Sequence, residues 1–444
     1  MTYDDLAGDV RAVSAEAGDP LRTNKSAVMQ WVRGRPPAAV TAGYIAEAMS
    51  RRLGRQLRPC DLGFDTPDKE QPRNLLGLVT GLDPVDMLRR IGEADIHRRK
   101  FLTAAAYSVA AAALPLGTDQ AVDYAHRARS ARTGRAGQAE IDAVRDMTNL
   151  FTAIDERHGG QHGRSAVVQY LRTDVAALCE ASFATESEHR QAMSAAAAVA
   201  YLCGWKAYDA SEHGLAQHYY LQALALTREA GDTLHEAWIL RILAHNGMDI
   251  RRPESTLSLA DAALSLVHGR VDPATEALFT VTRARALAVA RRGPEAAAQI
   301  RAAQDLAAAG HTEALPEWAA RWGSPMGTVS SHTAKTFRAL GDHANAERHY
   351  GESARRRVLS EQPRISALSM AAQGREQAAQ GHLEEACGTW SKSLASLGGV
   401  RSDRAAKEVR AIRRHLQVFH GRGVRVAAVL DEQALAWQRT YATV

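Results

Sequence analysis

Hydrogen-bonding and basic side chains gather in one short stretch of the sequence, residues 23–35. Asn24 can accept a backbone N–H of a first helical turn, and Gly34 followed by Pro36 ends the helix. A short helix that presents small polar and basic groups from its first turn suits the base edges of a DNA major groove. The side chains that would make such contacts belong to Thr23, Asn24, Lys25, Ser26, Met29, Gln30, Arg33 and Arg35.

The charge around this stretch is strongly positive. Between Arg22 and Arg58 the sequence holds eight arginine or lysine residues and a single acidic residue, Glu47. Clustered cations can neutralise DNA phosphates, so we expect Arg51 and Arg52 to contact the backbone of a duplex. The alternative is an ordinary capped surface helix with a solvated basic face.

The rest of the sequence has no catalytic or metal-binding pattern. The 17 histidines are scattered, and there is no His-Glu-x-x-His, no Gly-rich phosphate loop and no Gly-x-Ser-x-Gly. The four cysteines are widely spread, which argues against zinc and disulfides and fits a reducing cytoplasm. No apolar run reaches the roughly 18 residues of a membrane helix. We therefore expect a cytoplasmic protein that is not an enzyme, with no cofactor, no metal and no membrane span.

The elements that would position these residues are helices. Apolar residues make up 45% of the chain but aromatic residues only 6%, and alanine-rich runs favour closely packed helices over sheets. An apolar stripe of Tyr3, Leu6, Val10 and Val13 predicts a first helix, and residues 40–53 predict the helix that follows the polar stretch. The polar, proline-containing residues 65–72 predict a linker.

These N-terminal residues resemble a known family. Leu21–Val28, Trp31, Gly34 and Tyr44–Gly54 look like the actinobacterial Cro/repressor-like (XRE-type) helix-turn-helix transcription regulators, specifically a group with a C-terminal tetratricopeptide-repeat domain. The resemblance implies that Trp31 anchors the domain core and that Asn24, Lys25, Ser26 and Met29 face base edges. The sequence departs from the family pattern because it starts at the helix that is usually second and has a longer interval at 18–22. We therefore expect the first helix of the domain to be missing.

A repeated pattern of small and large residues runs from residue 166 to residue 393. The triplets are Ala166/Tyr170/Thr173, Ala216/Tyr220/Ala223, Thr256/Ala260/Ala263, Ala296/Ile300/Ala303, Ala346/Tyr350/Ser353 and Ala386/Trp390/Ser393, with steps of 50, 40, 40, 50 and 40 residues. Small residues at fixed offsets let one helix nest against its neighbour, which is how tetratricopeptide repeats stack. The predicted fold is all-α, with a helix-turn-helix domain (1–64), a linker with connecting helices (65–136) and a tetratricopeptide-like solenoid (137–444).

The repeat register also predicts a binding groove. The equivalent positions, each eleven residues before a triplet, are Trp205, His245, Arg285, Lys335 and Arg375, and Tyr201, Tyr208, Trp238 and Asn246 lie on nearby turns. A basic row with aromatic neighbours suits a peptide carboxylate or an acidic protein segment. The alternative is that these residues solvate the groove or pair with acids of adjacent helices.

The patterns favour a sequence-specific regulator of transcription. It would bind double-stranded DNA, form a homodimer, and use the solenoid to sense a peptide or protein partner or to dimerise. A tetratricopeptide scaffold for protein interactions that does not bind DNA is the alternative. An exported protein fits less well, because the segment that resembles an export signal, residues 98–116, begins far from the N-terminus.

Overall fold

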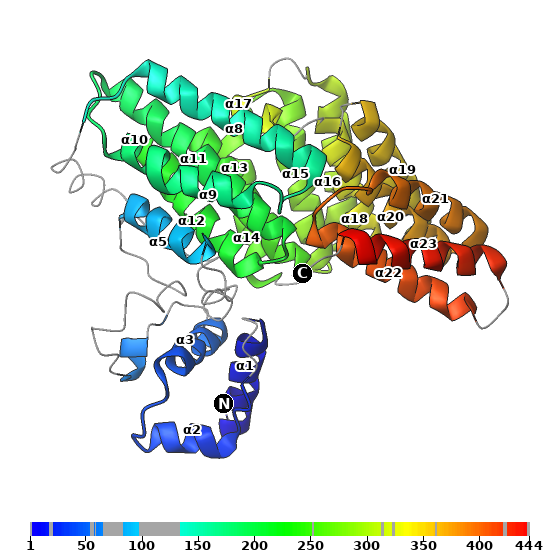
Figure 1. The fold of residues 1–444 in the computed structure, drawn as a ribbon, viewed down its shortest axis with the longest axis horizontal. Coiled ribbons are helices and arrows are strands. Elements are labelled where there is room, and N and C mark those ends of the chain that lie inside the picture. The colour runs from blue at the N-terminus through cyan, green and yellow to red at the C-terminus, as the bar shows by residue number, and fades with distance from the viewer. Residues whose placement is uncertain are drawn as a thin grey trace. The chain divides into compact units, whose positions relative to one another are not determined.

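The computed structural model describes residues 2–16, 21–53, 57, 59–64, 83–96, 134–250, 253–311, 315–321, 325–359, 362–420 and 424–441. Every regular element within these ranges is a helix, and one isolated β-bridge joins Arg135 and Ser182 (Figure 1). The prediction of an all-α helical solenoid is confirmed. None of the described helices is both long enough and apolar enough to cross a lipid bilayer. Most of the predicted linker region, residues 65–82 and 97–133, lies outside the described residues.

Three N-terminal helices share one small core. They are α1 (Tyr3–Glu16), α2 (Lys25–Val32) and α3 (Ala39–Leu53), followed by a 3-10 turn, η1 (Pro59–Leu62). Helix α1 packs against both α2 and α3. The apolar stripe predicted for the first helix lies in this core, where Leu6, Val10 and Val13 meet Val28, Tyr44, Ile45 and Ala48. Only Tyr3 of that stripe is exposed.

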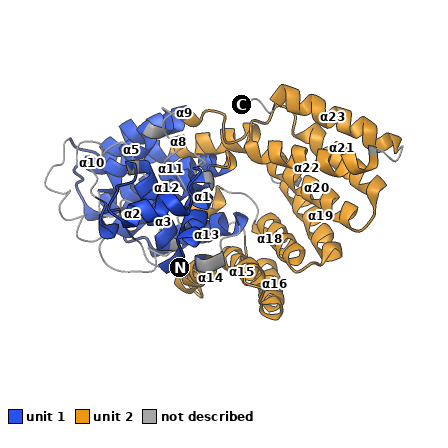
Figure 2. Ribbon diagram, turned by 90° about the horizontal axis from the view of Figure 1, so that it is seen from below, with its two compact units in different colours: residues 1–145, 165–208, 212–255 blue, residues 146–164, 209–211, 256–444 orange. Residues whose placement is uncertain are grey.

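The chain divides into two compact units, each made of separate sequence segments (Figure 2). The first comprises residues 1–145, 165–208 and 212–255, and the second comprises residues 146–164, 209–211 and 256–444. The remaining helices are α5 (Pro84–Ile96), α8 (Gln138–His158), α9 (Arg164–Tyr170), the π-helical turn η6 (Leu171–Val175), α10 (Ala176–Glu180), α11 (Glu186–Asp209), α12 (His213–Glu229), α13 (Thr233–Asp249), α14 (Pro253–Val267), α15 (Pro273–Val289), α16 (Gly293–Ala309), α17 (Glu317–Ala320), α18 (Pro325–Ala339), α19 (His343–Leu359), α20 (Pro363–Ala379), α21 (Leu383–Ser396), α22 (Asp403–His420) and α23 (Arg425–Tyr441).

Five of the six predicted triplets line the contacts between stacked helices. They lie on α12, α14, α16, α19 and α21, and all of their side chains are buried. The first triplet is wrong, because Ala166 and Thr173 are exposed and the apolar residues Val167, Val168 and Leu171 face the core instead. The chain passes there from α9 into a π-helical turn, which changes the period at which side chains return to one face.

In two of the buried triplets the large middle residue packs against a glycine of the preceding helix. Tyr220 lies against Gly204, and Trp390 lies against Gly374; a β-carbon added at either glycine would come within 2.5 and 2.4 Å of the ring. Within the second unit, the residues sixteen positions before Ile300 and Tyr350 are the buried alanines Ala284 and Ala334. This pairing of a large residue with a small one lets the repeats stack closely.

Candidate nucleic-acid interface

Helix α2 has the beginning and the end that the sequence predicts. The Asn24 side-chain oxygen accepts the Ala27 backbone N–H at 3.0 Å. At the other end, Gly34 adopts a φ of 92°, and its N–H donates to the Trp31 carbonyl at 3.0 Å. The Arg35 N–H donates to the Gln30 carbonyl, also at 3.0 Å, which completes a Schellman motif. Both ends of α2 are therefore fixed by their own hydrogen bonds.

Packing against the N-terminal core sets which side of α2 faces outward. Val28 is buried, and Trp31 is half-buried and packs against the same core, as the resemblance implies for a core anchor. Val32 lies on the other side and is 64% exposed. The buried stripe of α2 is therefore narrow, and its residues other than Val28 are exposed or half-buried.

The structure exposes six of the eight residues predicted to contact bases or nearby phosphates. Asn24, Lys25, Ser26, Gln30, Arg33 and Arg35 are exposed, and Met29 is half-buried. Thr23 is placed differently: it is buried, and its carbonyl accepts a hydrogen bond from the Arg11 guanidinium at 2.5 Å. The prediction that Thr23 contacts DNA is wrong, because this residue, just before the helix cap, is buried and joins α2 to α1.

Of the two α3 arginines predicted to contact phosphates, Arg52 is already engaged by a carboxylate of the protein. The Arg52 guanidinium donates two hydrogen bonds to Asp9, from Nε at 2.9 Å and from its terminal nitrogen at 2.6 Å. The side chain of Arg51 lies outside the described residues. Glu47, the acidic residue of this basic region, is buried, so its carboxylate is withdrawn from the basic surface. Within residues 22–35, all the charged side chains are exposed and cationic.

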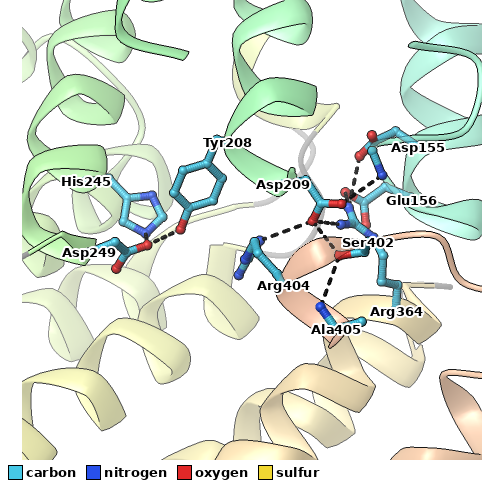
Figure 3. A network of polar contacts seen from close by, with 11 residues as sticks. Asp155, Glu156, Tyr208, Asp209, His245, Asp249, Arg364, Ser402, Arg404 and Ala405 are labelled. Atoms are coloured by element: carbon cyan, nitrogen blue, oxygen red, sulfur yellow. Dashed lines mark hydrogen bonds and ion pairs between the residues drawn. The ribbon is translucent and has the colours of Figure 1, made fainter. Parts of the chain in front are cut away.

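The predicted groove residues of the first unit are mostly buried among one another. Trp205 is half-buried and its ring stacks on Tyr208 at 5.2 Å between centroids, while Tyr201 and Trp238 are buried with centroids 6.3 Å apart. The Tyr208 hydroxyl and the His245 ring both meet Asp249, the latter at 3.4 Å (Figure 3). The Asn246 side-chain nitrogen donates to the His213 carbonyl at 3.0 Å.

The groove residues of the second unit do not form an open basic row. Arg285 is buried, Lys335 is half-buried, and Arg375 forms an ion pair with Glu408. Burial lowers the pKa of Arg375, but the Glu408 carboxylate more than offsets this effect, so the pKa is raised. The expectation of an exposed cationic row needs correction, because Arg285 is buried, Lys335 is half-buried and Arg375 has an acidic partner. Arg375 follows the alternative, in which these residues pair with acids of adjacent helices.

A buried polar network that the sequence patterns do not predict joins three segments of the second unit. The Arg364 guanidinium lies 2.7 Å from Asp209 and 2.9 Å from Asp155, and all three side chains are inaccessible (Figure 3). Ser402, which also caps α22, donates to Asp209 at 2.9 Å, and the Gly160 N–H donates to the same carboxylate at 2.9 Å.

Burial shifts the pKa values of two charged groups next to this network, Glu156 and Arg357, in the directions expected for desolvation. Burial raises the pKa of Glu156, against the attraction of Arg364, which lies 3.4 Å away. Burial also lowers the pKa of Arg357 to about 10, although the charge of Glu156 opposes this shift. The sequence carries no signal for this network, since its members are isolated charges far apart in the chain.

Comparison with known proteins gives matches to a family model and to solved structures. A family model described as the SP15 N-terminal domain matches residues 1–65, which covers α1, α2, α3 and η1. No curated protein matches the sequence. Among solved structures, aspartyl phosphate phosphatase F from Bacillus subtilis is similar at a TM-score of 0.35 and 12% sequence identity, covering 71% of this chain and 78% of that chain. The Cro/repressor-like resemblance is not among these matches and stays a prediction.

Proposed function

We propose that this protein is a sequence-specific DNA-binding transcriptional regulator of the cytoplasm, in which α2 reads the DNA. The observation that carries the proposal is the exposed face of α2: Lys25, Ser26 and Gln30 point outward from a helix whose two ends are fixed and whose buried side packs on α1 and α3. A major groove admits one α-helix, and its base edges are read by side chains of these types.

The surrounding charge supports the same proposal. Arg22, Arg33 and Arg35 are exposed around α2, and the acidic residue of the region is buried. Cations of this kind would hold the helix on the duplex through phosphate contacts, which carry no sequence information by themselves. The base contacts would then come from the first two turns of α2, near Lys25 and Gln30.

Titration of the full-length protein against genomic DNA fragments at rising salt tests the proposal. Lys25→Ala and Gln30→Ala should each weaken binding to the preferred fragment by roughly 5- to 150-fold, since one good base contact is worth about 1–3 kcal/mol. Arg33→Ala should weaken binding to all fragments and flatten the salt dependence. Lys392→Ala, which removes an exposed cation from α21, is the matched control and should bind as the wild type does. An absence of preference among fragments at low salt would favour the scaffold that does not bind DNA.

For the helical repeats we propose a second role, the binding of a partner or a second copy of the chain. Two reading helices on one duplex need a dimer, and helical repeats offer long surfaces for association. An acidic peptide or protein segment is the proposed partner. Lys335 is half-buried, so its charge is the more accessible one compared with buried Arg285. Lys335→Glu should then weaken the binding of an acidic peptide in calorimetry while sedimentation still reports the wild-type oligomer; unchanged peptide binding would place the site elsewhere.

A further inference from the structure

The turn that ends α2 brings Arg35 back onto Gln30. Because Gly34 takes a positive φ, the Arg35 N–H reaches the Gln30 carbonyl, and the two side chains leave the backbone close together. The Arg35 guanidinium donates to the Gln30 side-chain oxygen at 3.3 Å. One lone pair of this glutamine oxygen is therefore engaged within the protein, and the bond fixes which end of the amide carries its NH2, a donor.

The same holds at the other end of the helix. The Asn24 side-chain oxygen is used by the helix cap, so its NH2 is the group left for a ligand. Lys25, Arg33 and Arg35 can only donate, and the carboxylate of Glu47 is buried. Ser26 adds a hydroxyl, which can donate as well as accept, so donor groups outnumber acceptors among the described side chains exposed on α2 and its two ends.

A surface of donors discriminates among base pairs. In the major groove, guanine presents two acceptors, N7 and O6, side by side. Adenine places a donor beside its acceptor, and cytosine presents a donor, so both would face a donor of α2 without a partner. Asparagine and glutamine usually read adenine by donating and accepting together, and the bonds that the Asn24 and Gln30 oxygens already accept within the protein make that paired contact less favourable.

From this arrangement we infer that α2 reads a guanine-rich half-site, in which the Gln30–Arg35 pair supplies the donors for one guanine edge. The inference rests on the proposed DNA-binding function and specifies its target. Arg35 has two tasks in this arrangement. It donates to the Gln30 oxygen, which fixes the amide orientation, and its guanidinium has further N–H groups that can donate to a base.

Selection of the full-length protein on randomised duplexes tests the inference. The selected sites should share at least two guanines on one strand. Replacing these guanines with 7-deazaguanine removes the N7 acceptor and should lower affinity by about 10-fold or more, as expected for loss of part of a bidentate contact. The same duplex with 7-deazaadenine in place of its adenines is the control and should bind with unchanged affinity.

The variant Arg35→Ala gives a second, independent readout. Without Arg35, the Gln30 oxygen is free to accept from the adenine amino group, so one selected position should change from guanine to adenine. Lys392→Ala should select the wild-type site. Selected sites made mainly of A·T pairs, or affinity that ignores 7-deazaguanine, would overturn the inference while leaving DNA binding intact. If no duplex is selected at all, the proposed function itself fails, and the inference fails with it.

Discussion

At the scale of single residues, the contact between Trp390 and Gly374 shows how the repeats approach each other. The indole lies over the glycine, and its Nε1 donates to the Ala371 carbonyl at 3.1 Å. A methyl group at position 374 would lie 2.4 Å from that nitrogen, so either the ring or the helix has to shift.

We expect Gly374→Ala to lower the free energy of unfolding by about 1–3 kcal/mol, as overpacking does in well-packed cores. Gly388→Ala is the matched control, since position 388 lies in α21 and nothing comes within 4 Å of its added β-carbon. That variant should be stabilised by about 0.5–1 kcal/mol, because alanine is the better helix former. Urea unfolding followed by circular dichroism measures both, and equal stabilisation of the two variants would contradict the packing described here.

The second residue-scale prediction concerns His218, a buried side chain of α12. Burial lowers its pKa from 6.5 to about 4. The unfolded chain therefore takes up a proton near pH 6.5 while the folded chain resists it, so stability is present above pH 6.5 and is lost as the pH falls towards 4. The resulting loss in the free energy of unfolding is about 3 kcal/mol.

We expect the variant His218→Leu to show a flatter decline of stability between pH 7 and pH 4 than the wild type. The free energy of unfolding at several pH values, from urea titrations, gives the comparison. His311→Leu changes an exposed histidine and serves as the control. A wild-type slope in the His218→Leu variant would mean that other groups cause the acid sensitivity.

At the scale of elements, two valines mark the buried side and the exposed side of α2. Val28 is 1% exposed and Val32 is 64% exposed, although both lie on the same short helix. Val28→Ala removes two buried methyl groups and should destabilise the N-terminal helices by about 2 kcal/mol. Val32→Ala should change stability by less than about 0.5 kcal/mol. Hydrogen exchange of peptides from residues 21–53 measures the difference, and similar protection in both variants would disprove the orientation of α2.

Local sequence signals predicted the elements well, because each depends on neighbouring residues. Asn24 and Gly34 mark the ends of α2 by their own chemistry, and five triplets marked buried helix faces. The first triplet failed because a π-helical turn changed the period, which residue spacing does not reveal. The prediction of an open basic row is wrong at Arg285, which is buried, and at Arg375, which pairs with Glu408. Both outcomes depend on the packing of adjacent helices, which residue spacing does not reveal.

At the scale of the whole molecule, the second unit is assembled from segments that are distant in sequence. Residues 146–164, 209–211 and 256–444 each contribute to the network around Arg364, through Asp155, Asp209 and Arg364 itself. A close approach of Gly159 to the Arg401 carbonyl and the hydrogen bond from the Arg401 N–H to the His158 carbonyl, at 2.8 Å, join two of the same segments. Such contacts depend on the complete fold, so no local pattern predicts them.

Removing Arg364 should therefore loosen the second unit more than the loss of any surface ion pair. In Arg364→Met, Asp155 and Asp209 would keep their buried positions without their cation, and breaking a buried pair in this way costs about 3–5 kcal/mol. Arg292→Ala, which breaks an exposed pair with Glu295, is the control and should have little effect. Glu156→Gln should also be tolerated, since burial already favours the protonated form of this carboxyl and Arg364 keeps its two aspartates.

Urea unfolding gives the free energies for these three variants, and hydrogen exchange gives their location. In Arg364→Met, peptides containing Gly160 and Ala405 should lose protection first, because their N–H groups are held by Asp209 and by Ser402. The network would have no such role if Arg364→Met were no less stable than Arg292→Ala. A uniform loss of protection across the second unit would instead mean that its three segments unfold together, with Arg364 contributing to the stability of the whole unit rather than to one contact.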